Sequence, residues 1–392
     1  MKPRKITNQI YWMGSIDWDR RLFDSLIPLP DGTSYNAYLV KGSDKIALVD
    51  TVDPAMANEL LYQLEGVDKI DYIISNHAEQ DHSGSIPHVL SKFPEAKIVT
   101  TTKAKGMLIE LLRIPEKFFI TIEDGGILSL GDKTLKFIYT PWVHWPETMV
   151  TYLQEDKVLF SCDFFGSHLA TSNLYVIDEG RVYEAAKRYY AEIMMPFRKI
   201  IAKNLKKLES YDIEMIAPSH GPIYPRPSFI IDAYRDWIFN APRNTVVLPY
   251  VSMHKSTKLM VDHFVAALVE RGVGVEQFNL VVTDIGKLAI SLVDACTIII
   301  GTPTVLAGPH PLAIYAAFLS NALRPKAKFL SIIGSYGWGG KTIEVLSGMI
   351  PNLKVEIIDP VLSKGVPKES DFKAIEHLAE IISMKHQELN IK

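Results

Sequence analysis

The sequence predicts an α/β protein with two domains, because its 392 residues change rhythm once, near residue 243. Before that point, strand-like and helix-like segments alternate unevenly, which is typical of layered sheets that helices cover on their outer faces. After it, five short apolar strands alternate regularly with helices, as in an open, doubly wound parallel sheet. We therefore expect one domain over residues 1–243 and a second over residues 244–392.

In the first domain, the expected strands are short apolar or β-branched runs, and the expected helices have apolar residues three and four positions apart. The strands are predicted over residues 34–40, 45–50, 72–76, 97–101, 135–140, 149–154 and 158–161. The helices are predicted over residues 55–64, 86–93, 104–112 and 182–208. In the second domain, the strands are predicted over residues 246–250, 274–280, 297–300, 329–333 and 355–358.

The composition is that of an ordinary soluble enzyme, with 47% apolar and 22% charged residues and a formal net charge of −3. No global basic field is present that would attract nucleic acid. The two cysteines, Cys162 and Cys296, are too few for a secreted disulfide scaffold. The first residues lack the apolar core of a signal peptide, and no apolar stretch approaches the roughly 20 residues of a membrane span. We expect a cytoplasmic protein that binds neither nucleic acid nor membrane.

Four metal-ligand side chains lie within six consecutive positions, directly after an apolar run that is expected to be a buried strand: His77, Glu79, Asp81 and His82. A strand that ends in alternating His, Glu and Asp directs these side chains into one cleft at its carboxyl end. Two imidazoles and two carboxylates favour iron or manganese over metals that prefer thiolates. A surface loop could have this composition by chance, but the density of ligands favours a metal site.

Three further candidates each follow an expected strand or lie in a turn: His144, Asp163 and His220. Taken alone, each has a simpler explanation, because a single loop histidine is more often a surface or hydrogen-bonded residue. Their shared position at strand ends strengthens the case that they complete the site of the first motif.

This order of residues resembles the metallo-β-lactamase fold, whose binuclear site uses a His-x-His-x-Asp-His loop followed by His, Asp and His. Here Glu79 replaces the second histidine, and this departure resembles the flavodiiron family of A-type flavoproteins over essentially the whole chain. The resemblance implies an N-terminal metallo-β-lactamase-like αββα sandwich followed by a flavodoxin-like doubly wound sheet. It implies one iron bound by His77, Glu79 and His144, a second bound by Asp81, His82 and His220, and a bridge from Asp163.

The replacement by Glu79 agrees with iron, because an additional carboxylate makes the site more anionic and stabilises ferric as well as ferrous ions. Zinc has no redox chemistry, so an enzyme that cycles oxidation state needs another metal. Two further residues are candidates near the metals. His168 either lines the substrate pocket or caps a turn. In the similar family a tyrosine near the position of Tyr190 approaches the metals, although packing into a helix face is the commoner role.

The second domain has three segments at strand ends where a cofactor could bind. The first lies at a helix N-terminus, where hydroxyls and free N–H groups can hold a phosphate, although N-capping alone would explain it. The others are Gly-rich and offer aromatic surface beside a planar ring. The candidate residues are Ser252, Met253, His254, Lys255, Ser256 and Thr257, then Pro303, Thr304, Val305, Leu306, Ala307 and Gly308, then Ser335, Tyr336, Gly337, Trp338 and Gly339.

These segments resemble flavodoxin, which implies FMN with its phosphate in the first segment and its isoalloxazine between the other two. A dinucleotide is disfavoured, because the first segment lacks the Gly-x-Gly-x-x-Gly spacing. Lys255 stands where relatives often have a smaller residue, and it would be strained if the backbone there needs a positive φ.

Together, FMN and a diiron centre imply a reductase of dioxygen to water, of nitric oxide to nitrous oxide, or of both. The similar family forms head-to-tail homodimers or dimers of dimers, which bring the FMN of one chain beside the metals of another. No pair of Cys-x-x-Cys motifs follows the flavin domain, so we expect a separate electron donor such as a rubredoxin-like protein. Two alternatives stay open, a zinc-dependent hydrolase and a diiron oxygen sensor without significant turnover. Iron and FMN content and turnover with a reduced donor would separate the three.

Overall fold

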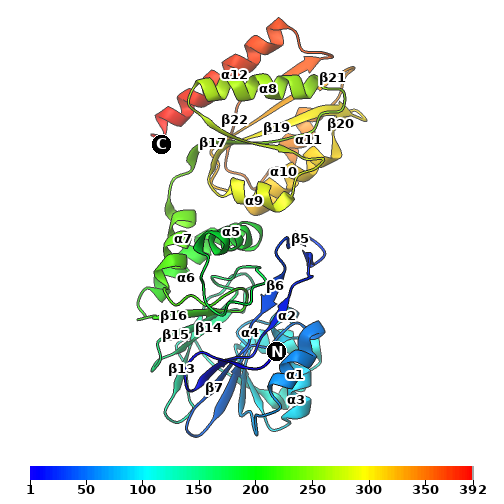
Figure 1. Cartoon of the computed structure of the whole chain (residues 1–392). Coiled ribbons are helices and arrows are strands. Elements are labelled where there is room, and N and C mark those ends of the chain that lie inside the picture. Colours follow the sequence, from blue (N-terminus) through cyan, green and yellow to red (C-terminus); the bar gives the residue numbers. More distant parts are fainter. Residues whose placement is uncertain (391–392) are drawn as a thin grey trace. The chain divides into compact units, whose positions relative to one another are not determined.

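The computed structural model describes residues 1–390 and divides the chain into two compact units, each with α/β architecture (Figure 1). Within the described residues, the first unit comprises Met1–Tyr190 and Phe197–Ile238, and the second comprises Ala191–Pro196 and residues 239–390. Within the described residues, none of the helices combines the length and apolar character needed to cross a membrane.

The first unit contains two main sheets. The larger runs in the order β1 (Arg4–Lys5), β2 (Ile10–Trp12), β7 (Tyr38–Lys41), β8 (Ile46–Val49), β9 (Tyr72–Ile74), β10 (Lys97–Thr100) and β11 (Phe119–Thr121). The smaller runs in the order β12 (Ile127–Ser129), β13 (Thr134–Tyr139), β14 (Met149–Leu153), β15 (Val158–Cys162) and β16 (Met215–Pro218). Two short ribbons are added, β3 (Ser15–Asp17) with β6 (Thr33–Tyr35), and β4 (Leu22–Phe23) with β5 (Ile27–Pro28).

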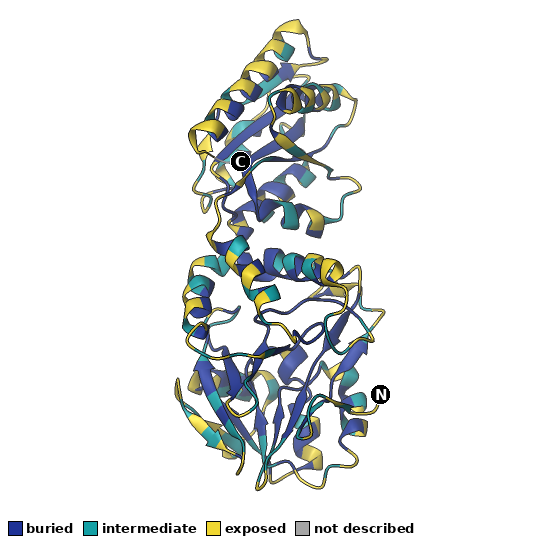
Figure 2. Ribbon diagram, turned by 60° about the vertical axis from the view of Figure 1, so that its left-hand side comes forward, coloured by how far each residue is buried: buried dark blue, intermediate teal, exposed yellow. Residues whose placement is uncertain are grey.

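The two sheets pack face to face, since alternate side chains of both enter one buried cluster, for example Val40 of β7 and Phe137 of β13. The opposite face of the larger sheet is covered by helices, whose buried residues include Leu60, Val89 and Leu108. Figure 2 shows these buried layers in dark blue. The covering helices are α1 (Ala57–Gln63), α3 (Ile86–Lys92) and α4 (Thr102–Leu112).

The remaining helices of the first unit are α2 (Gln80–Ser83), α5 (Glu179–Tyr189), α6 (Arg198–Leu208) and α7 (Ser228–Phe239). Helix α6 buries Ile201 and Leu205 and lies beside the smaller sheet, where Lys207 donates to the carbonyl of Tyr139 at the end of β13. Helices therefore flank both sheets, and the expected αββα sandwich is confirmed.

The prediction of one continuous helix over residues 182–208 is wrong. Helix α5 ends at Tyr189, a π-helical turn and a 3-10 turn follow over Tyr190–Met194 and Met195–Phe197, and α6 then begins. Pro196 explains the break, because proline lacks an N–H group and its ring disfavours helical backbone at the preceding residue. The apolar periodicity continues across the interruption, which is why the sequence pattern did not reveal it.

The prediction of one strand over residues 34–40 is also wrong, because β6 and β7 belong to different sheets. Between them, Asn36 leaves the strand pairing and bonds to the turn after β16. Its N–H donates to the carbonyl of Ser219, and its side-chain amide donates to the carbonyls of Pro218 and Gly221. These bonds tie the chain to the turn that carries His220.

The second unit is an open parallel sheet in the order β18 (Gly274–Asn279), β17 (Arg243–Tyr250), β19 (Ala295–Val305), β21 (Phe329–Tyr336) and β22 (Glu356–Ile357), with β23 (Val361–Lys364) also paired to β21. Figure 1 shows helices on both of its faces, which confirms the expected doubly wound sheet. They are α8 (Ser256–Glu270), α9 (Ile285–Leu292), α10 (Pro311–Leu323), α11 (Thr342–Gly348) and α12 (Glu369–Glu388).

Two segments that we expected as loops begin as strand. Strand β19 continues to Val305 and turns through Leu306 and Ala307, which have φ values of 49° and 61°, into β20 (Gly308–Pro309). Strand β21 continues to Tyr336. The pairing of β19 with β21 reaches Pro303, which lies opposite Ser335. The second and third candidate segments therefore leave the sheet side by side.

His386 in α12 gives the second unit a pH-dependent stability. Its ring is buried, with Nδ1 2.8 Å from Oδ1 of Asn244 and Nε2 2.7 Å from Oγ1 of Thr297. Burial lowers the pKa of His386 to about 4. Between this value and the unfolded pKa near 6.5, only the unfolded chain binds the proton, so stability falls as the pH falls. We expect a loss of about 2 kcal/mol between pH 7.5 and pH 5, measured by urea unfolding of the second unit.

The His386→Gln variant should be less stable at pH 7.5 and should lose little more on acidification to pH 5. His377→Gln on the same helix is the matched control, because this ring is exposed, and its pH dependence should follow that of the unsubstituted protein. Parallel losses in the unsubstituted protein and in His386→Gln would contradict the assignment.

Candidate functional site

The first motif lies between β9 and the one-turn helix α2. His77 and Glu79 occupy the extended connection, whereas Asp81 and His82 belong to α2, so the expected alternation along a strand end is wrong. The hydroxyl of Ser83 donates to the carbonyl of Glu79 at 2.9 Å and closes this turn. The turn brings together side chains that a straight strand would have pointed to opposite faces.

The other three candidates come from the smaller sheet. His144 follows β13, Asp163 follows β15 directly, and His220 follows β16. The pairing of β15 with β16 shifts register between Phe160 and Cys162, and Cys162 has a φ of 51°. Such a bulge bends the strand and redirects the side chain that follows, here Asp163.

The structure brings all seven side chains together in two sets, and the first contains two imidazoles and two carboxylates. Nε2 of His77 lies 3.1 Å from Oε2 of Glu79 and 3.4 Å from Oδ2 of Asp163. Nε2 of His144 lies 3.0 Å and 3.5 Å from the same two oxygens. A metal bound at roughly 2.0–2.2 Å holds its ligand atoms at about these separations.

The second set uses the other oxygen of the same carboxylate. Nε2 of His82 lies 2.9 Å from Oδ1 of Asp163 and 3.3 Å from Oδ2 of Asp81. Nε2 of His220 lies 3.5 Å and 3.1 Å from these two oxygens. Asp163 therefore offers one oxygen to each set, which is the arrangement of a bridging ligand.

The hydrogen bonding of these groups fits bound metal ions. Several buried atoms of the cluster have no hydrogen-bond partner within residues 1–390. They are both carboxylate oxygens of Asp81 and of Asp163, and Nε2 of His82. Buried polar atoms without a partner are costly, and cations shared by the two sets would satisfy them. Nitrogen and oxygen donors with no thiolate suit iron or manganese.

The charges of the cluster also favour cations. Burial lowers the pKa of His144, but the nearby carboxylates of Asp163 and Glu79 raise it more strongly, to about 9. In the same way, the carboxylates of Asp163 and Asp81 outweigh burial and raise the pKa of His220 to about 10. The carboxylates therefore outweigh the burial of the imidazoles and draw positive charge into the cluster.

Two groups that the sequence did not reveal fix the orientation of two of these histidines. Nδ1 of His77 donates to Oε1 of Glu147 at 2.6 Å, and Nδ1 of His220 donates to the carbonyl of Ser34 at 2.7 Å. Both bonds leave Nε2 directed at the cluster, as in carboxylate–histidine–metal arrangements. Glu147 has one weak sequence signal, because it is an acidic residue just before an apolar strand. Ser34 has none, because its backbone carbonyl, and not its side chain, accepts the hydrogen bond.

His168 lies beside the second set, with its ring centroid 4.5 Å from that of His220. Its Nδ1 is 2.8 Å from Oγ1 of Thr33, and its Nε2 is buried without a hydrogen-bond partner in the described residues. Burial lowers the pKa of His168 well below its usual value, so this imidazole is neutral. Its position agrees with a pocket-lining residue, a role that stays a prediction.

The adjacent tyrosines Tyr189 and Tyr190 face different surroundings. The ring of Tyr190 packs against Tyr234 and Trp237, at 5.4 Å and 5.2 Å between centroids. The ring contact with the cluster is made by Tyr189, which lies 5.8 Å from the His220 ring. The π-helical turn begins at Tyr190, so the sequence could not show which of the two faces the metals.

The three candidate segments of the second unit lie at one edge of the sheet. The hydroxyls of Thr257 and Ser335 are 3.0 Å apart and join the first segment to the third. The hydroxyls of Thr304 and Thr342 are 2.8 Å apart and join the second to the residues after the third. A Cβ at Gly340 would lie 2.7 Å from Cγ2 of Thr304, so only glycine allows this close approach.

The first segment fits a phosphate group. The N–H groups of residues 253–256 donate to no other group within residues 1–390, and they precede or begin helix α8. Lys255 has a φ of 69°, so the backbone conformation that would strain this lysine is the one it adopts. Leu306 and Trp338 leave 92% and 69% of their surface exposed, which offers apolar area for a flat ring.

Fold and site together define a protein in which a metallo-β-lactamase-like unit, with two clustered sets of metal-ligand side chains, precedes a flavodoxin-like unit. Residues 33–221 match the family described as ODP family beta lactamase. The chain is 34% identical to a nitric oxide reductase of Moorella thermoacetica, over 98% of this chain and 99% of the relative. The chain belongs to the flavodiiron protein family.

Two solved structures are similar over nearly the whole chain. The rubredoxin oxygen:oxidoreductase of Desulfovibrio gigas is 29% identical, covers 98% of this chain and 99% of its own, and has a TM-score of 0.95. The flavodiiron protein of Giardia intestinalis is 26% identical, covers 100% and 99% of the two chains, and has a TM-score of 0.90.

Glu147→Gln should weaken metal binding by about tenfold or more, because the neutral amide orients His77 less strongly and lowers its basicity. Iron content after dialysis against a graded chelator measures this loss. Glu116→Gln is the matched control, since among residues 1–390 this exposed glutamate pairs with Lys105 alone. Equal iron retention in both variants would show that Glu147 does not support the site.

Proposed function

We propose that this chain reduces dioxygen, nitric oxide or both at a non-haem diiron centre that receives electrons from FMN. The observation that carries the proposal is the pair of donor sets that share Asp163, with Glu79 in the first set. The relatives named as a nitric oxide reductase and as an oxygen oxidoreductase support the choice of substrates.

The proposed ligands of one iron are His77, Glu79 and His144, those of the other are Asp81, His82 and His220, and Asp163 bridges them. The proposed FMN site is formed by the three segments, with the phosphate at the start of α8. When bound, the flavin and the two irons supply the redox chemistry, storing electrons that single side chains cannot hold.

The protein itself supplies position and exclusion of water. Asp163 fixes the separation of the two sets, while Glu147 and the carbonyl of Ser34 hold two imidazoles in place. All seven ligand side chains except that of His144 are buried, so water is largely excluded from the reacting centre. The neutral ring of His168 places its unpartnered Nε2 beside the second set, where it can form a further hydrogen bond.

Glu79 argues against a zinc hydrolase. A third histidine would give a neutral donor set that suits zinc, whereas the carboxylate gives a harder and more anionic set. The second unit also argues against that alternative, because a hydrolase has no use for a flavin-like site.

The electron donor is proposed to be a separate protein such as a rubredoxin-like carrier, in line with the name of the Desulfovibrio relative. We also propose a head-to-tail homodimer, in which the FMN of one chain serves the metals of the other. Sedimentation of the loaded protein would test the dimer independently of turnover.

The test of function is anaerobic stopped-flow oxidation of the fully reduced, iron- and FMN-loaded protein, mixed separately with dioxygen and with nitric oxide. A reductase should reoxidise its flavin faster than free FMN with at least one gas, and the faster gas is the preferred substrate. If neither gas does so, the reductase assignment fails.

The matched variant is Glu79→His, which should retain FMN but raise the ratio of bound zinc to iron. Its flavin should be reoxidised no faster than free FMN, because zinc cannot accept electrons. Rapid reoxidation in a zinc-loaded variant would show that the metal centre is not the site of gas reduction.

A further inference from the structure

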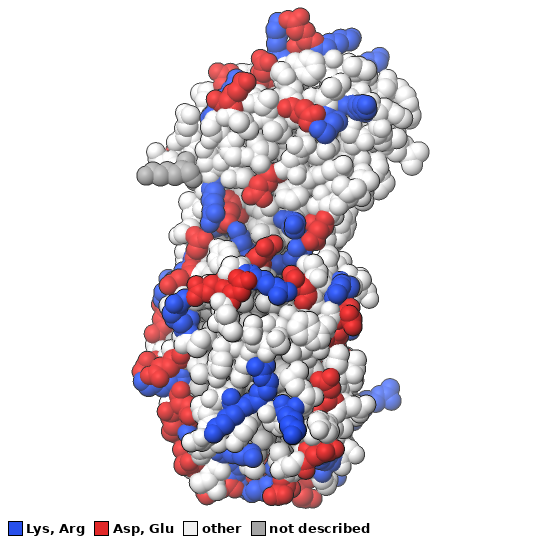
Figure 3. Space-filling view, viewed as in Figure 1, with Lys and Arg blue, Asp and Glu red and all other residues white. Residues whose placement is uncertain are grey.

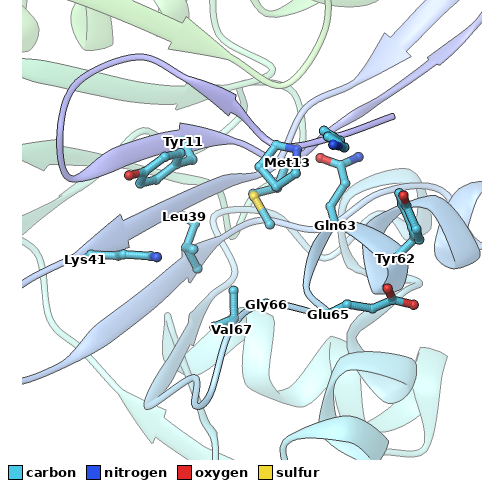
Figure 4. Close-up of a pocket in the computed structure, with 11 residues that line it drawn as sticks. Tyr11, Met13, Leu39, Lys41, Tyr62, Gln63, Glu65, Gly66 and Val67 are labelled. Atoms are coloured by element: carbon cyan, nitrogen blue, oxygen red, sulfur yellow. The ribbon is translucent and has the colours of Figure 1, made fainter.

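A hollow of about 290 Å³ lies on the first unit, formed by the N-terminal residues, by β2 and β7, and by the end of α1 (Figure 4). None of its lining residues belongs to the seven-residue cluster. Its volume is at the lower end of the roughly 300–1,000 Å³ of pockets that bind small organic molecules.

The sheet explains why the hollow is apolar at its base. Tyr11 of β2 lies opposite Leu39 of β7, and the strand period of two places Met13 and Lys41 on the same face. This is the helix-covered face, because Met13 and Leu39 belong to the same apolar cluster as Leu60 of α1, and Tyr11 packs against it. Met13 and Leu39 are almost fully buried, while the ring of Tyr11 is half-buried.

Gln63 is the strongest sign of a ligand. Its side chain is only 3% exposed, and its Nε2 donates to the carbonyl of Gly14 at 2.7 Å. This bond fixes the orientation of the amide, so Oε1 is left as a buried acceptor, and no described residue donates to it. A buried carbonyl oxygen without a donor is costly, and a ligand N–H or O–H would satisfy it.

The charges at the rim favour an anion. Lys2 and Lys41 form no ion pair within the described residues, and the ammonium of Lys41 lies 5.1 Å from the centre of the Tyr11 ring. The exposed carboxylate of Glu65 leaves an excess of one positive charge among the lining side chains. Figure 3 shows Lys and Arg side chains gathered on the face of this unit that carries β7 and the N-terminus.

The geometry points to a binding site for a small aromatic anion that carries one hydrogen-bond donor. The flat apolar body rests on Met13, Leu39 and the Tyr11 ring, the donor reaches Oε1 of Gln63, and the anionic group meets Lys41 and Lys2. This site is independent of the metal centre and of its proposed reaction.

Two probes that differ in the donor test the site by isothermal titration of the iron- and FMN-loaded protein. They are 8-anilinonaphthalene-1-sulfonate, which has an N–H group, and naphthalene-1-sulfonate, which has none. Lys41→Gln should lower the affinity of the protein for both probes by about threefold to fivefold at low salt. Lys117→Gln is the matched control, because Lys117 makes the same ring contact at 5.1 Å with Phe118, and it should change neither affinity.

Gln63→Met keeps the length of the side chain and removes the acceptor. This substitution should lower the affinity for 8-anilinonaphthalene-1-sulfonate by about fivefold and leave the affinity for naphthalene-1-sulfonate unchanged. If Gln63→Met lost equal affinity for both probes, the fold would be distorted and the role of Gln63 would be overturned. Since Lys41 is at the rim, its variant stays informative if Gln63→Met does not fold. Affinities that are the same in Lys41→Gln and Lys117→Gln would overturn the site.

Discussion

The cluster of seven metal-ligand side chains depends on one carboxylate, that of Asp163, which is 1% exposed and offers one oxygen to each donor set. The position of the Asp163 side chain results from irregular backbone at the end of β15, and not from regular strand geometry. The register shift before Cys162 and the positive φ of that residue turn the chain out of β15. The N–H of Gly166 then donates to the carbonyl of Asp163 at 3.0 Å and closes the turn. Strained conformations of this kind persist where the surrounding structure fixes them.

The seven-residue cluster could be predicted from the sequence because each member lies in a segment that follows an apolar strand. Strand ends of both sheets meet at one edge of the sandwich, so residues such as His77 and His220 converge although they are far apart in the chain. The supporting groups could not be predicted in this way. Glu147 lies 2.6 Å from Nδ1 of His77, and only this three-dimensional packing distinguishes it from a surface glutamate.

The main errors of the sequence interpretation share one cause, which is that periodicity reports the buried face and not the continuity of the backbone. The apolar spacing of residues 182–208 survives the π-helical turn, so the break that separates Tyr189 from Tyr190 is invisible in it. The run over residues 34–40 is mostly apolar and almost entirely buried, yet Asn36 within it leaves the strand pairing to bond with the turn after β16. In the second unit, the strands predicted to end at residues 300 and 333 continue to Val305 and Tyr336, because the sheet pairing extends through glycine and proline.

The two donor sets differ in their access to solvent. In the second set the side chains of His82 and His220 are each 1% exposed, whereas in the first set those of His144 and Glu79 are 16% and 10% exposed. Solvent therefore reaches the centre from the side of the first set. Glu79, the residue that departs from the zinc-binding pattern, lies on this accessible side. The added negative charge therefore lies in the set that solvent reaches, while the second set stays enclosed and holds the shared carboxylate.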